Sequence, residues 1–233
     1  MLCKSRAIVL HQIKFGGSSL IVTLYTEKYG RIACIVNGVR SKKTRIHSNM
    51  FQPLSLLELD LYYRQNRDIQ RIKEVTCAFI YTTIPFQVYK NTIALFLAEV
   101  LYLTLREEES NPALFSFLFH AFQLLDGKKK GIVNFHLWFM LHYSGFLGIF
   151  PADYNKKNEI ELLADLQVFY TMPSEASSAL TKMLKSPQEI PENMNISNQN
   201  RTLLLDRIIR YYNLHLEGFS KLKSYTVLQE VFK

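Results

Sequence analysis

The residues with the clearest chemical meaning in this sequence are four cations that fall within six positions. No apolar side chain interrupts the run, so it cannot enter a hydrophobic core and is expected to be a solvated loop. Fixed positive charges of this kind neutralise phosphates and release their counterions, although a hairpin tip without a ligand has the same composition. The run predicts a site for the backbone of a polyanion, with these members: Arg40, Lys42, Lys43 and Arg45.

The positive charge of the chain is concentrated in its first third. The 233 residues carry a formal charge of +8; residues 1–80 hold 13 Lys/Arg against 5 Asp/Glu, and the other 153 residues hold 15 of each. Such asymmetry raises the local concentration of a polyanion, so we expect nucleic acid to bind this segment. Further cations that would extend the surface are Lys14, Arg31, Arg64, Arg67 and Arg71, and tyrosines that could stack on bases, or pack in a small barrel, are Tyr25, Tyr29, Tyr62 and Tyr63.

Residue types that catalysis uses are present, but not at useful spacings. Glu58 and Asp60 are two apart and share a strand face, as in a divalent-metal nuclease, yet no third carboxylate accompanies them and a solvated strand face has the same pattern. His136 and His142 are six apart, about 240° around a helix, and cannot share a ligand. No phosphate-cradling loop, dinucleotide fingerprint or HExxH motif occurs. We expect a protein that is not an enzyme and uses no cofactor.

Cysteine usage and hydropathy indicate a cytoplasmic protein. Cys3, Cys34 and Cys77 form neither a CxxC pair nor a Cys/His cluster, so reduced thiols are expected and no metal site. The first ten residues lack the apolar stretch of a signal peptide. Residues 132–152 carry no Asp, Glu, Lys or Arg, which is long enough for a membrane span, but their His, Gly, Asn and Pro residues favour a buried core helix.

The elements that position the cations are short strands in the first 75 residues. Leu57, Leu59 and Leu61 alternate with polar residues, as in a strand with one buried face. Gly30 supplies the positive φ of a tight turn. Strands are expected over 6–13, 20–26, 31–39, 57–62 and 69–75. With no helix between the first four, they predict a small antiparallel barrel, because closure removes exposed edges.

After Pro85 the apolar residues recur at helical spacing. Helices are expected over 93–105, 112–127, 132–143, 173–185, 197–216 and 225–232, with Asn111 as a cap before Pro112. The fold class is therefore β followed by α, with a barrel domain over 1–80 and an all-helical domain over 81–233.

Cations in the helical part suggest a different kind of partner. Arg207 and Arg210 share a helix face near Tyr211 and Leu214, so they could dock an acidic peptide with an apolar tip. Three lysines after Gly127 suit either a helix end or the same partner: Lys128, Lys129 and Lys130.

The first 75 residues resemble the RecO family of bacterial recombination and repair mediators. The resemblance lies in the runs RAIVLHQIKFGGSSLIVTLYTEKYGRIACIVNGVRSKKTR and FQPLSLLELDLYYR. It implies an N-terminal OB-fold, binding of single- and double-stranded DNA, strand annealing, and loading of RecA at gaps. It also implies RecR and the acidic tail of single-stranded DNA-binding protein as partners, and a bacterial, nucleoid-associated protein.

One feature of many RecO family members is missing from the sequence. These members hold zinc with four cysteines in the second domain, whereas here no cysteine follows Cys77. We therefore expect no zinc site.

A second class of function stays open at this point, namely an OB-fold protein that binds structured RNA. It would need contacts to the 2′-hydroxyl.

Overall fold

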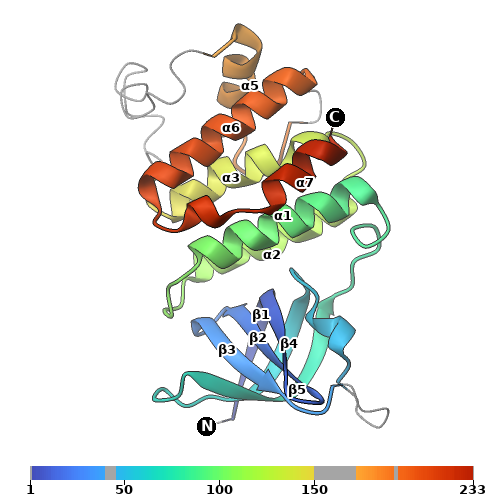
Figure 1. The fold of residues 1–233 in the computed structure, drawn as a ribbon, viewed down its shortest axis with the longest axis vertical. Helices are drawn as coiled ribbons and strands as arrows, with labels where there is room; N and C mark the ends of the chain where they lie inside the picture. The colour runs from blue at the N-terminus through green and yellow to red at the C-terminus, as the bar shows by residue number, and fades with distance from the viewer. Residues whose placement is uncertain (1, 40–45, 150–171, 192–193, 233) are drawn as a thin grey trace. The chain divides into compact units, whose positions relative to one another are not determined.

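The structure is a computed structural model that describes residues 2–39, 46–149, 172–191 and 194–232. The chain divides into two compact units, Met1–Asp126 and Gly127–Lys233. Among the described residues, strands occur only in the first unit, whereas helices occur in both units (Figure 1). The chain changes from strands to helices between Phe79 and Val88, close to the expected position 80/81. That a domain boundary lies at 80/81 stays a prediction.

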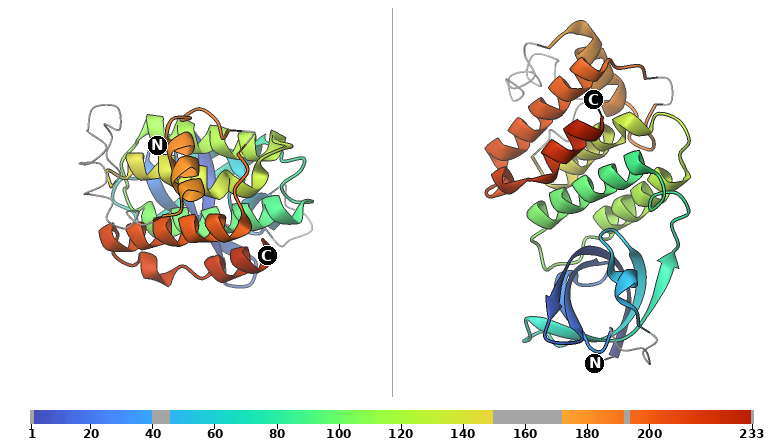
Figure 2. Two further views of the ribbon diagram at one scale, coloured as in Figure 1. Left: turned by 90° about the horizontal axis from the view of Figure 1, so that it is seen from above. Right: turned by 45° about the vertical axis from the view of Figure 1, so that its right-hand side comes forward.

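The first unit begins with a closed five-stranded barrel, which appears as a ring when seen along its axis (Figure 2, right). The strand order is β1-β2-β3-β5-β4, and β4 pairs with β1 to close it. The expected OB-fold barrel is confirmed, with one difference: β3 and β5 run parallel, while the other pairs are antiparallel. The strands are β1 (Leu2–Phe15), β2 (Ser19–Thr26), β3 (Gly30–Val36), β4 (Leu56–Tyr62) and β5 (Ile69–Phe79).

Alternate residues of β1, β2, β3 and β4 fill the barrel, as the sequence pattern predicts for β4. Leu57, Leu59 and Leu61 are at most 2% exposed, whereas Glu58 points outward. Cys34 lies in the same core, where burial raises the pKa of its thiol to about 12 and keeps it protonated. The side chains that share this core, Phe51 of the short helix η1 (Ser48–Phe51) among them, stabilise the barrel by leaving water.

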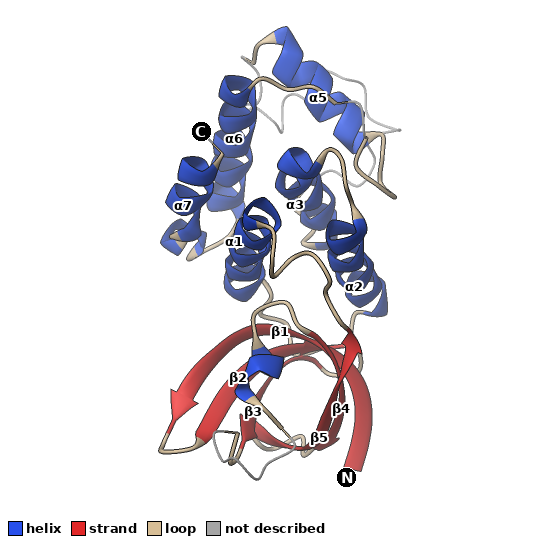
Figure 3. Ribbon diagram, turned by 90° about the vertical axis from the view of Figure 1, so that its right-hand side faces the viewer, coloured by secondary structure: helices blue, strands red, loops and turns tan. Residues whose placement is uncertain are grey.

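Helices α1 (Val88–Thr104) and α2 (Pro112–Gly127) follow the barrel (Figure 3, helices in blue). The side chain of Asn111 accepts a hydrogen bond from Leu114 N at 3.0 Å, so the predicted cap before Pro112 is confirmed. The cap satisfies an amide at the start of α2 that has no partner within the helix.

A buried carboxylate holds the segment between β5 and α1. Asp126, 2% exposed, accepts hydrogen bonds from the backbone N–H groups of Thr82, Thr83 and Ile84 at 2.8–2.9 Å. Lys90, 1% exposed, donates to the backbone oxygen of Asp126 and to Thr83 Oγ1. Burial opposes ionisation, but the hydrogen bonds from Thr82, Thr83 and Ile84 outweigh it and lower the pKa of Asp126 to about 2. The ionised form of the Asp126 carboxylate therefore stabilises the folded state.

The second unit contains a bundle of helices. Its elements are α3 (Phe135–Phe146) after η2 (Ile132–Asn134), α5 (Ser174–Leu184), α6 (Asn198–His215), η4 (Phe219–Lys221) and α7 (Ser224–Val231). Helix α3 contacts α5 and α6, and Trp138 Nε1 donates to Ser186 O at 2.7 Å. Tyr212 donates to Met140 O at 2.7 Å. The elements at 132–143, 173–185, 197–216 and 225–232 are found close to their predicted ranges.

The uncharged stretch that starts at residue 132 forms η2 and α3 in its described part. Among the described residues, no helix is both long and apolar enough to cross a bilayer. His136 lies in α3, and burial lowers its pKa to about 3, so its imidazole is neutral at physiological pH.

We predict that replacing Asp126 with Asn destabilises the protein by about 2 kcal/mol at neutral pH, since a carboxylate pKa lowered by almost two units represents that much stability. Because the folded pKa is depressed, the stability is present above about pH 4 and is lost as the pH falls towards 2. The difference between the natural protein and Asp126→Asn should therefore shrink below pH 4 in urea unfolding. Asp68→Asn, at an exposed position, is the control and should change little. A constant difference at all pH values would contradict the prediction.

Candidate nucleic-acid interface

A cleft of about 670 Å³ lies over the outer face of β2 and β3. Its floor includes Thr23 and Ala33, which are partners in the β2–β3 register. One wall is the loop between β4 and β5 with the start of β5 and Tyr29 of the turn before β3, and the other is the end of α1 with the residues that follow it. In OB-folds this strand face and the loop after β4 commonly bind oligonucleotides. The wall residues are Tyr29, Tyr63, Gln65, Arg67, Asp68 and Gln70 on one side and Tyr102, Leu103, Arg106 and Glu108 on the other.

The helical wall of the cleft is attached to the barrel by Arg31. Its guanidinium donates to Tyr102 O at 2.8 Å and to Leu105 O, both at the C-terminal end of α1. The same guanidinium lies 4.8 Å from the centre of the Tyr102 ring. A cation is favourable there because the last carbonyl groups of a helix carry partial negative charge. Arg31 was expected to contact DNA; that role stays a prediction, and its guanidinium already has protein carbonyls as partners.

Gly30 lets the same wall approach the barrel closely. Its φ is +59°, which confirms the predicted turn, and a Cβ atom there would lie 2.8 Å from Glu107 O. The next amide, Arg31 N, donates to Glu107 O at 2.9 Å. A side chain at position 30 would therefore displace the segment after α1.

The opposite wall is held in shape by the side chain of Gln70, which is 4% exposed. Its Oε1 accepts from Arg64 N at 2.9 Å, and its Nε2 donates to Arg64 O and Arg67 O at 2.9 and 2.7 Å. Arg64, Arg67 and Arg71 are exposed, and within the described residues none of them forms an ion pair. The buried amide thus fixes a loop that presents Arg64 and Arg67 to solvent, and Arg71 follows on β5.

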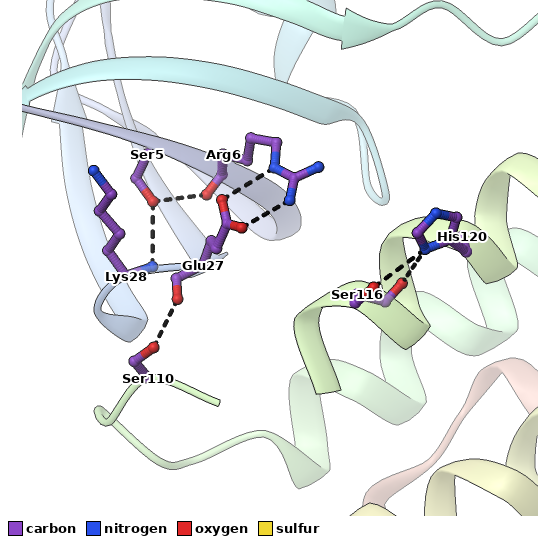
Figure 4. A network of polar contacts seen from close by, with 7 residues as sticks. All are labelled: Ser5, Arg6, Glu27, Lys28, Ser110, Ser116 and His120. Carbon is purple, nitrogen blue, oxygen red and sulfur yellow. Dashed lines mark hydrogen bonds and ion pairs between the residues drawn. The ribbon is translucent and has the colours of Figure 1, made fainter. Parts of the chain in front are cut away.

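On another side of the barrel, Arg6 and Lys4 are paired with carboxylates. A hollow of about 390 Å³ there is lined by Lys4, Arg6 and Lys28 together with Glu27, Glu58, Asp60 and Glu74. Figure 4 shows Arg6 donating to both carboxylate oxygens of Glu27, at 3.0 and 2.7 Å. The Arg6 guanidinium also lies 4.9 Å from the centre of the Phe119 ring, and Lys4 is 3.9 Å from Asp60. This side therefore offers a phosphate little uncompensated charge.

The predicted tyrosines differ in their exposure. Tyr25 is 2% exposed, so it belongs to the core, and Tyr62 is 44% exposed. Tyr29 and Tyr63 stack on each other with ring centres 3.9 Å apart and planes 14° apart. Both line the cleft, so they are the tyrosines that the structure places beside the expected cations.

The remaining predicted cations of the barrel lie elsewhere or outside the described residues. Lys14 is exposed on β1, close to the turn that leads into β2. Arg40, Lys42, Lys43 and Arg45 fall outside the described residues. Sequence reasoning missed Gln70, Tyr102 and Arg106, because their roles depend on contacts between distant segments.

Two family models match this chain. Residues 1–81 match the model described as "Recombination protein O N terminal" and residues 85–156 match "Recombination protein O C terminal". The chain belongs to the RecO family. Proteins named "DNA repair protein RecO" are similar to it over the full length of both chains, with 39% identity in Bacteroides fragilis, 36% in Phocaeicola vulgatus and 32% in Flavobacterium psychrophilum. It is thus a DNA repair protein of that family.

The second unit of this RecO family protein carries the other predicted cations. Lys128 is 7% exposed and its Nζ donates to Ile190 O at 3.3 Å, so it has a partner inside the unit. Lys129 and Lys130 are exposed. On α6, Arg207 is half-buried and Arg210 is exposed, and Leu214 on the next turn is 65% exposed.

No group of three or more His, Cys, Asp or Glu side chains that could hold a metal ion occurs among the described residues. Glu58 and Asp60 line the hollow that also holds Lys4 and Arg6.

We predict that Gly30→Ala destabilises the protein by about 3 kcal/mol, because the new Cβ adds a steric conflict with backbone to the cost of a positive φ. Gly16→Ala is a matched control: φ is +58° there, but no atom lies within 4 Å of the added Cβ. It should cost only about 1 kcal/mol. Denaturant unfolding measures both, and equal losses would show that the segment after α1 is not closely packed on Gly30.

Proposed function

We propose that this protein binds single- and double-stranded DNA through its barrel, anneals complementary strands, and helps to load RecA at gaps coated by single-stranded DNA-binding protein. The observation that carries the proposal is a set of exposed cations next to the cleft over the OB-fold face: Arg64 and Arg67 on the loop between β4 and β5, and Arg71 on β5. Among the described residues, none of the three has an ion-pair partner. Cations in this position can neutralise phosphates, whereas Arg6 and Lys4 on the Glu27 side are already paired with carboxylates.

The outer surface of the barrel also offers apolar contacts beside these cations. Ile13, Ile21 and Ile35 are successive partners across β1, β2 and β3, and Ile35 is in turn paired with Arg71 of β5. Ile13 and Phe15 are about half exposed, at 48% and 51%. Single strands commonly bind by combining a charged track for the backbone with apolar or aromatic surface for the bases. A strand along this row would have both.

Annealing by such a surface needs charge and position but no covalent step. Two strands repel each other through their phosphates, and a protein that neutralises phosphates on both lowers that repulsion. We therefore propose a role without catalysis or cofactor, with little preference for sequence because phosphate contacts carry none.

We propose that protein partners bind the helical part. Arg207, Arg210 and Leu214 combine charge with an exposed apolar side chain, which fits an acidic peptide with an apolar end, such as the tail of single-stranded DNA-binding protein. Lys129 and Lys130 are further candidates, and RecR is proposed as a second partner.

For the barrel, we predict that Arg64→Ala/Arg67→Ala/Arg71→Ala flattens the salt dependence of single-strand binding by about 2 in slope, since each phosphate contributes about 0.7. The same measurement on the fourfold alanine variant of Arg40, Lys42, Lys43 and Arg45 should lower the slope by about 3. Thermal unfolding should remain nearly unchanged in both variants. Fluorescence anisotropy of a labelled oligonucleotide at several salt concentrations gives the slopes.

The control for these charges is Lys4→Ala/Lys28→Ala/Lys73→Ala, which removes three charges from other parts of the barrel. Its slope should stay within about 0.7 of the natural value. An equal loss in the control would mean that only net charge matters. RNA of equal length serves as competitor, and a clear preference for RNA would instead favour an RNA-binding function.

For the helical part, we predict that Arg207→Ala/Arg210→Ala weakens binding of a labelled acidic peptide to the full chain about tenfold, because charge-assisted hydrogen bonds contribute about 1.5 kcal/mol or more. Lys182→Ala/Lys185→Ala removes two exposed charges from α5 and its end, and should bind as the natural protein does. If the peptide fails to saturate the natural protein, this surface has another role.

A further inference from the structure

Aromatic rings reach the cleft over β2 and β3 from both of its walls. The stacked pair Tyr29 and Tyr63 lies on the barrel side, and Tyr102 lies on the helical side. The floor between them is made of the small residues Thr23 and Ala33. A volume of about 670 Å³ is in the range of small-ligand sites, so a flat group of the size of a base has room there.

The rings of this cleft are held in place before any ligand arrives. Tyr29 is fixed by stacking and by a hydrogen bond with Cys3, which raises the pKa of its hydroxyl to about 12 and keeps it uncharged. Tyr102 packs against His11, with ring centres 4.7 Å apart, and against the Arg31 guanidinium. Binding of a ligand in the cleft would therefore cost little side-chain conformational entropy.

The charges of the cleft favour a neutral group over a phosphate. The cleft lining contains Asp68 and Glu108 as well as Arg67 and Arg106, so these four charges sum to zero. The third cation, Arg31, is bonded to the carbonyl groups of α1. A phosphate would gain little net attraction inside, whereas Arg64 and Arg71 lie outside the cleft lining and have no ion-pair partner among the described residues. The backbone thus belongs outside the cleft and an uncharged part of the strand inside it.

We propose that this cleft binds one unpaired base of a bound strand, stacked on the Tyr29–Tyr63 pair, while the phosphates on either side contact Arg64 and Arg71. The inference rests on the proposed binding of DNA and adds the position of a base. A base in a duplex is paired and stacked on both faces, so it can enter only after it is unstacked at a cost. The cleft therefore favours single strands and unpaired positions over duplex.

The test compares three ligands of one length: an intact single strand, the same strand with abasic residues through its centre, and the duplex. The natural protein should bind the intact strand about tenfold or more tightly than the abasic one, as expected for stacking of a base on an aromatic ring. Tyr63→Ala should bind the intact and abasic strands equally and should keep the natural affinity for duplex. Tyr63→Phe keeps the ring and should behave as the natural protein does.

A second variant keeps the test decisive if Tyr63→Ala does not fold. Ala33→Phe fills the floor of the cleft without removing a tyrosine, and should also abolish the difference between intact and abasic strands. If either folded variant still discriminates as the natural protein does, or loses duplex binding to the same extent, the base does not bind in the cleft. If the natural protein binds none of the three ligands, the proposed function itself fails, which is a different result from normal duplex binding without discrimination.

Discussion

The geometry of the candidate interface depends on one interaction, the attachment of the end of α1 to β3 by Arg31. A guanidinium that donates to Tyr102 O and Leu105 O satisfies carbonyl groups that a helix end leaves without partners, and it positions the Tyr102 ring at the same time. Gly30 makes the approach sterically possible. Without this attachment, the face of β2 and β3 would be an open sheet surface; with it, that face becomes the floor of a cleft with two walls.

The same barrel separates its cations into two chemical groups. Around Glu27 and Asp60, ion pairs and ring contacts compensate Arg6 and Lys4, so their positive charges are not available to a phosphate. On the loop braced by Gln70, the arginines face solvent without ion pairs among the described residues. The net charge of +8 is therefore a poor guide to where a phosphate gains free energy. A phosphate gains most free energy beside a cation that is not already paired with a carboxylate.

Local patterns were sufficient for the elements but not for the interface. Alternation at Leu57, Leu59 and Leu61 predicts β4, and Asn111 before Pro112 predicts the start of α2, because each signal depends on neighbours in sequence. The sequence identifies Arg31 only as a cation on a strand. Its hydrogen bonds to the end of α1 cannot be predicted locally, because their acceptors lie more than seventy positions away. The pairing of Asp126 with residues 82–84 and the bracing by Gln70 have no local signature either: an Asp at a helix end and a Gln on a strand occur in many settings. Long-range hydrogen bonds decide these roles, and the order of residues does not reveal them.

The two kinds of surface also suit the proposed binding of a strand without preference for its sequence. Exposed arginines bind phosphates, which are alike along any strand, and a stacked pair of tyrosines accepts the flat face of any base. In the proposed arrangement, a contact of each type would restrain the strand at a different point, and the bases between them would stay accessible to a complementary strand. Tight burial of every base would oppose annealing, because each pairing step would first have to remove a base from the protein. A single cleft beside an open charged surface, as proposed here, would leave most bases free to pair while the backbone remains neutralised.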